Sequence, residues 1–183
     1  MQVTLYFAQS TDKEMILAVD VSYNQDEAFA AGVAFHNWTD EKPSYEVTTS
    51  LKGINSYIPG SFYLRELPVI LELLKKLNEM PEAIIIDGYV WLGSEKKDGL
   101  GGRLYKALDK KIPVIGVAKS PFKDTPETIK LLRGKSLRPL YVTSAGISLQ
   151  EAKTYIAHMH GRNRIPTLLK RADRLSREGT TAY

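Results

Sequence analysis

The chain has 183 residues, 43% of them hydrophobic and 25% charged, with a formal net charge of +4, which is typical of one globular domain spanning 1–183. It has no cysteine, so disulfides, thiolate metal sites and cysteine nucleophiles are excluded. No apolar run is long enough to cross a bilayer and the N-terminus lacks a secretory signal pattern, so we expect a cytoplasmic protein without a membrane partner.

Three apolar runs in the first part of the chain predict three strands. They cover 15–21, 28–35 and 45–51, and the last of them alternates polar and apolar residues. The connections between them are short and polar, over 24–26 and 40–43. Strands joined by such short connections pair antiparallel, so we expect a meander.

The rest of the chain alternates helical and strand patterns. In chain order we expect a helix over 62–77, a strand over 83–87, a helix over 100–108, a strand over 112–118, a short strand over 140–142, and helices over 149–160 and 166–178. Three antiparallel strands followed by helices and parallel strands give an α/β fold of the RNase H-like kind. We therefore expect a mixed sheet flanked by helices.

Three carboxylates fall where such a fold binds ligands. Asp20 and Asp87 each close an apolar strand, and Glu66 lies near the start of the intervening helix. The carboxyl ends of neighbouring parallel strands open into one crevice, so these side chains are expected to converge. Converging carboxylates favour a hard cation such as Mg²⁺, which can activate water for phosphodiester cleavage. The alternative is that the aspartates are ordinary polar strand ends and Glu66 a helix-start acid.

The C-terminal third is strongly basic. Between residues 129 and 177 there are eleven lysines and arginines and two acids, Glu151 and Asp173. Such a charge distribution favours a polyphosphate partner. A solvated helical face explains it equally well from charge alone.

Several motifs around these residues carry a resemblance to a known family. The most specific are Tyr-Ile-Pro-Gly at 57–60 and Gly-Val-Ala-Lys-Ser at 116–120. The chain resembles the endonuclease V family, which nicks nucleic acid 3′ to deoxyinosine or inosine, as a short and divergent member. The matching segments are 18–23, 57–60, 64–68, 86–88, 113–120, 139–142, 147–152, 164–166 and 171–175.

The resemblance implies roles for individual residues. It implies a Mg²⁺ cofactor, with Mn²⁺ as a substitute, and an inosine-containing nucleic acid as the partner of a monomeric enzyme. The implied catalytic residues are Asp20, Glu66, Asp87 and Lys119. The implied metal ligands are Asp20, Glu66, Asp87 and Asp173. The implied nucleic-acid-binding residues are Tyr57, Ile58, Pro59, Gly60, Gly88 and Ser120, the first four as a wedge beside an extruded base.

Each role has a simpler alternative. Asp173 has basic neighbours and fits a helix-surface salt bridge equally well, Lys119 fits a solvent-facing strand end, and residues 59–60 fit an ordinary Pro-Gly turn. The chain also departs from the family after Gly88, where Tyr89-Val90-Trp91 replaces the usual histidine and glycine. This change motivates a second hypothesis, a catalytically altered nucleic-acid-binding module. A third is a nuclease for branched or mismatched DNA, and the sequence does not separate DNA from RNA substrates.

Overall fold

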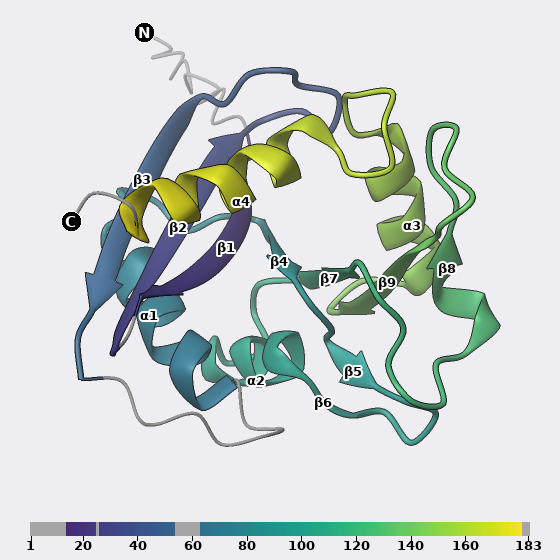
Figure 1. The fold of residues 1–183 in the computed structure, drawn as a ribbon, viewed down its shortest axis with the longest axis horizontal. Coiled ribbons are helices and arrows are strands. Elements are labelled where there is room, and N and C mark those ends of the chain that lie inside the picture. The colour runs from purple at the N-terminus through teal and green to yellow at the C-terminus, as the bar shows by residue number, and fades with distance from the viewer. Residues whose placement is uncertain (1–13, 25, 54–62, 181–183) are drawn as a thin grey trace, which may run out of the picture.

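The computed structural model describes residues 14–24, 26–53 and 63–180 (Figure 1). These residues form one large sheet, a two-stranded ribbon and four α-helices. The strands are β1 (Ile16–Asn24), β2 (Glu27–Phe35), β3 (Tyr45–Leu51), β4 (Ala83–Asp87), β5 (Trp91–Leu92), β6 (Lys97–Asp98), β7 (Val114–Ala118), β8 (Lys130–Leu131) and β9 (Leu140–Ala145). The helices are α1 (Tyr63–Lys75), α2 (Leu100–Ala107), α3 (Leu149–His158), α4 (Thr167–Thr180) and the short 3₁₀ helix η1 (Glu127–Ile129).

The large sheet has the strand order β3-β2-β1-β4-β7-β9-β8. β1, β2 and β3 form the predicted antiparallel meander, and β4 and β7 then pair parallel on the other side of β1. β1 lies in the centre and is buried on both faces, which explains why its sequence is a continuous apolar run. The predicted RNase H-like mixed sheet is confirmed.

The sheet ends differently from the expected parallel series. β9 runs antiparallel to β7, and β8 pairs antiparallel with β9. A parallel crossover needs a covering element of a dozen or more residues, usually a helix. Between β7 and β9 the chain has only η1 and the two-residue β8 as regular structure, so it returns antiparallel. The β5–β6 ribbon and β8 are further elements that the sequence pattern does not predict.

Two helical layers cover the sheet, one on each face. Leu17 and Val19 of β1 pack in one core with α1 and α2, whereas Ile16 and Ala18 pack in the other core with α3 and α4. Figure 1 shows α4 crossing the face formed by β1 and β2. Because strand side chains alternate between faces, each residue of β1 is committed to one layer. The longest of the described helices, α4, has 14 residues, and none of them is long and apolar enough to cross a membrane.

Candidate metal and catalytic site

Two of the predicted carboxylates lie side by side at the ends of neighbouring parallel strands. Val19 of β1 pairs with Ile86 of β4, so Asp20 and Asp87 follow at the same level of the sheet. Asp20 comes two residues after Ala18 and Asp87 two after Ile85, which places both on the face covered by α3 and α4. Asp20 is buried, whereas Asp87 is more open to solvent.

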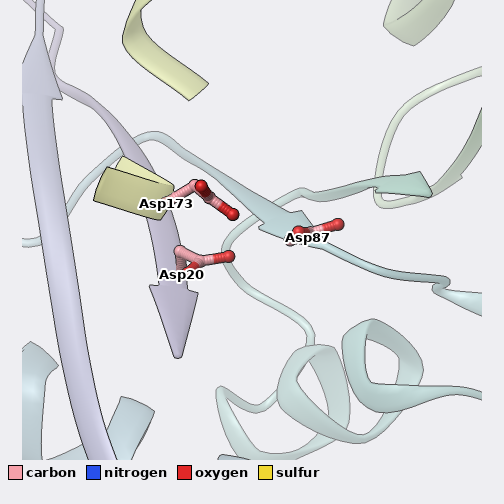
Figure 2. Close-up of side chains that lie close together, drawn as sticks. All are labelled: Asp20, Asp87 and Asp173. Atoms are coloured by element: carbon pink, nitrogen blue, oxygen red, sulfur yellow. The ribbon is translucent and has the colours of Figure 1, made fainter. Parts of the chain in front are cut away.

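A third carboxylate comes from the opposite end of the chain. Leu168, Ala172 and Ser176 form the buried stripe by which α4 packs on the sheet, and Asp173 follows directly after Ala172. Oxygens of Asp20, Asp87 and Asp173 lie within 4.8 Å of one another (Figure 2). We call these three residues the aspartate cluster. Oxygen ligands at this spacing fit a hard divalent cation, which would offset their mutual repulsion.

Lys119 already places a positive charge in this cluster. It follows β7, and its Nζ donates to Asp87 Oδ2 at 2.6 Å and to Asp173 Oδ1 at 3.3 Å. The ammonium thus bridges two of the three carboxylates. Burial works against its charge, but the neighbouring Asp87 carboxylate prevails and raises the pKa of Lys119. The alternative of a solvent-facing lysine does not agree with this geometry.

Sequence reasoning missed Ser176, which fixes the orientation of Asp20. Its hydroxyl is buried, donates to Asp20 Oδ2 at 2.6 Å and lies 2.9 Å from the backbone oxygen of Asp173. Ser22 of β1 donates in turn to the backbone oxygen of Ser176 at 2.7 Å. One signal in the sequence was its spacing, since residues three apart on a helix share a face with Asp173.

Glu66 lies outside the aspartate cluster. It belongs to α1, the layer on the opposite face of the sheet from α4, so it approaches the strand ends from the other side. It lines a small pocket of about 90 Å³ together with Asp20 and Asp87. The expected convergence of Asp20, Glu66 and Asp87 therefore occurs at the level of this pocket, while the tight set takes Asp173 in its place.

Burial and mutual repulsion perturb the acids of this site. Burial raises the pKa of Asp20 to about 6, and the charges of Asp87 and Asp173 add to this, while the Ser176 hydroxyl opposes it. Burial likewise raises the pKa of Glu66 to about 7, against the lowering effect of the Tyr23 hydroxyl. Burial also acts upward on Asp173, but Lys119 and Arg177 outweigh it and hold its pKa below the usual value.

These raised pKa values predict that the metal-free protein loses stability as pH rises. An acid with a higher pKa in the folded state binds more protons when folded, so its contribution is present at low pH and is lost through the folded pKa. Asp20→Asn removes the ionisation at that position. Measured by urea unfolding in EDTA, the stability gained by Asp20→Asn is expected to increase from about pH 5 to about pH 8.

Asp109→Asn is the matched control for this measurement. Asp109 has a side chain that is 81% exposed, so its removal should change the free energy of unfolding little at either pH. A stability gain for Asp20→Asn that does not vary with pH would contradict the raised pKa.

The loop after β4 is anchored by the residues that depart from the family pattern. The Tyr89 hydroxyl donates to the Ser120 carbonyl oxygen at 2.7 Å, and Trp91 Nε1 donates to the Ser144 carbonyl oxygen at 2.7 Å. Gly88 has a φ of +142°, which favours glycine. A Cβ on Gly116 would lie 2.6 Å from the Gly88 carbonyl oxygen, so glycine is needed there for the loop to cross β7.

The remaining predicted nucleic-acid contacts are placed in part. Gly88 and Ser120 each follow directly after a residue of the site, Asp87 and Lys119 respectively, and Ser120 is exposed. The predicted wedge, Tyr57, Ile58, Pro59 and Gly60, lies outside the described residues.

The basic C-terminal third does not form a uniform charged face. Arg133 is buried and donates to backbone carbonyl oxygens of α3 and the turn after it. Arg164 donates to the carbonyl oxygen of Lys119, and Arg171 pairs with both oxygens of Glu46. Several of the basic residues therefore hold the fold together, and one of them supports the strand end that carries Lys119.

Comparisons with known proteins agree with this site. The family model described as Endonuclease V matches residues 2–174. The endonuclease V of Thermus thermophilus is 29% identical over 182 residues, covering 86% of this chain and 78% of that protein.

Two solved structures share the fold. The crystal structure of endonuclease V from Streptomyces avermitilis has a TM-score of 0.74 and 27% identity, covering 92% of this chain and 82% of that one. A variant of Ciona intestinalis endonuclease V, in complex with a 23mer DNA containing an inosine, has a TM-score of 0.75 and 21% identity, covering 92% and 86%. The match to the family model extends over the strands and helices that build the aspartate cluster, and the chain therefore belongs to the endonuclease V family.

Proposed function

We propose that this chain is a single-domain, Mg²⁺-dependent endonuclease that cleaves a phosphodiester bond 3′ to deoxyinosine or inosine. The observation that carries the proposal is the aspartate cluster with Lys119 beside it, since it combines a cation site with a positive charge for a phosphate. The Ciona intestinalis relative, crystallised with inosine-containing DNA, supports the choice of substrate.

In this proposal Asp20, Asp87 and Asp173 hold the cation. When bound, it supplies the Lewis acidity that activates water and stabilises the leaving oxygen. Ser176 keeps the Asp20 carboxylate in place through its 2.6 Å hydrogen bond. Lys119 donates from the same edge of the sheet and neutralises charge that develops on the phosphate.

Glu66 has a separate part in the proposed mechanism. With a pKa raised to about 7 by burial, its carboxyl is suited to exchange a proton with water near neutral pH. It lines the pocket that also holds Asp20 and Asp87, so it faces the reacting region from the α1 side. We assign it as the proton acceptor for the attacking water, and its role as a direct metal ligand stays a prediction.

The experiment is a cleavage panel with matched inosine-containing and inosine-free strands, as DNA and as RNA. We expect cutting of the inosine strands with Mg²⁺ or Mn²⁺ and none in EDTA, because the carboxylates alone cannot offset the charge of the phosphate. Cutting without regard to inosine would contradict the substrate assignment. Mismatched and flap DNAs in the same panel test the branched-DNA hypothesis.

The second candidate function is a binding module that recognises altered nucleic acid without cutting it. The loop that follows Gly88 favours it, because Tyr89 and Trp91 are both tied to the protein backbone there. Retained binding in the panel, with no cleavage under either metal, would support this function over the first.

A further inference from the structure

A second cavity adjoins the carboxylates on the α1 side. It has a volume of about 860 Å³, and Glu66 and Leu100 line both this cavity and the small pocket that contains Asp20 and Asp87. We call it the lateral cavity. Its walls include Tyr63, Glu66, Tyr89, Asp98, Arg103 and Phe122. A volume of this order accommodates a nucleobase with its sugar.

One wall of the lateral cavity is aromatic and fixed in position. The rings of Tyr89 and Phe122 meet edge to face, with centroids 6.3 Å apart. The Tyr89 hydroxyl donates to the Ser120 carbonyl oxygen and accepts from the Phe122 amide at 3.2 Å. Phe122 is 46% exposed in spite of its size. An exposed aromatic wall held by hydrogen bonds is suited to stack on a base.

The other notable wall residue is Arg103 of α2. Its guanidinium lies 3.5 Å from the centroid of the Tyr63 ring. Its Nε is buried, and within the part of the chain that the structure describes this atom has no hydrogen-bond partner. Stacking on the ring fixes the plane of the guanidinium but does not use its N–H groups, which lie in that plane. Arg103 therefore keeps unused donors in fixed directions beside the cavity.

We propose that the lateral cavity receives an extruded purine and that Arg103 identifies it by donating to O6 and N7. This inference rests on the proposed function and names the residue that reads the base. Arginine pairs with the O6 and N7 acceptors of guanine, and hypoxanthine presents the same two acceptors. Adenine has an amino donor in place of O6, so it would face the guanidinium donors with a donor of its own.

The proposal leaves guanine to be excluded in another way. Guanine presents the same edge to Arg103, but in a G·C pair it must be pulled out of three hydrogen bonds. Extrusion costs least for a mismatched or altered base, which favours hypoxanthine. Arg103 thus separates hypoxanthine from adenine, and base-pair strength separates it from guanine. This reading of the base does not use the segment after Gly88 that differs from the family pattern.

The test compares two DNA strands, one with hypoxanthine and one with 7-deazahypoxanthine, in which a C–H group replaces N7. Wild-type protein should have a kcat/KM about tenfold or more higher on hypoxanthine. Arg103→Met should lower the rate on hypoxanthine to that on the 7-deaza base and leave the latter nearly unchanged. Arg103→Lys, which keeps the charge but not the planar fork, should retain part of the difference.

Lys111→Met is the matched control, because it removes one positive charge from a side chain that is 78% exposed and is expected to keep the wild-type preference. Thermal unfolding by circular dichroism checks that each variant is folded. The same four proteins are also compared by Kd for both strands in EDTA, which reads the preference even if no strand is cut.

Two results would overturn the inference. An equal loss on both bases in Arg103→Met would mean that Arg103 contacts the backbone or supports the packing of α1. Indifference of the wild-type protein to N7, in both kcat/KM and Kd, would mean that no donor reads that edge. Failure of the proposed function would look different, since the strands would then remain uncut while the preference in Kd persisted.

Discussion

Asp87→Asn is expected to lower cleavage of inosine-containing DNA by at least about 10³-fold while leaving the protein folded and able to bind the strand. The substitution keeps the shape of the side chain and removes one of the three charges of the aspartate cluster. Asp87 is the more open of the two strand-end aspartates and contacts Lys119 at 2.6 Å. Its loss therefore removes a cation ligand and leaves the core of the sheet undisturbed.

Binding should survive this substitution, since removing a carboxylate lowers the repulsion of phosphates. The measurement is single-turnover cleavage in Mg²⁺ together with fluorescence anisotropy of the same labelled strand. Asp109→Asn serves as the control for loss of one exposed negative charge and is expected to cut at the wild-type rate. Full cleavage by Asp87→Asn would sink the assignment of the cluster as the catalytic site.

Lys119→Met is expected to have effects of opposite sign on catalysis and on metal binding. Cleavage should fall by about 10²- to 10³-fold, because a fixed positive charge beside the phosphate is lost. Binding of Mn²⁺ to the free protein should become tighter. The ammonium group contacts both Asp87 and Asp173, so it neutralises the carboxylates that a divalent cation needs.

Metal affinity is measured by calorimetric titration with Mn²⁺ in the absence of nucleic acid, which separates it from activity. Lys111→Met provides the control for removing a lysine charge, and Lys119→Arg tests whether charge at that place is sufficient. Weaker metal binding in Lys119→Met would show that the lysine orients the carboxylates more than it competes with the cation.

The aspartate cluster also explains why metal and fold are coupled here. Asp20 is buried with its pKa raised to about 6, so at neutral pH an ionised carboxylate is held against desolvation and against two neighbouring charges. Ser176 and Lys119 offset part of this cost. A divalent cation offsets the rest, and we expect it to raise the unfolding temperature of the wild-type protein more than that of Asp20→Asn.

The sequence by itself determined the strands, the helices and two members of the site. An apolar run that ends in a carboxylate can be a buried strand only if the carboxylate emerges at the strand end, so Asp20 and Asp87 were predictable from local pattern. The antiparallel meander followed from short polar connections. Lys119, at the end of another apolar run, was predictable in position, although its contacts with Asp87 and Asp173 were not.

Only the tertiary structure decided which acids complete the site. Residues of β1 alternate between two helical layers, and the register commits Asp20 to the face covered by α4, so Asp173 joins the cluster and Glu66 approaches from the other side. The same packing brings Ser176 onto Asp20 across 156 positions of sequence. Such contacts depend on how layers dock, and neither hydrophobic period nor residue spacing specifies which turn of a helix meets which strand end.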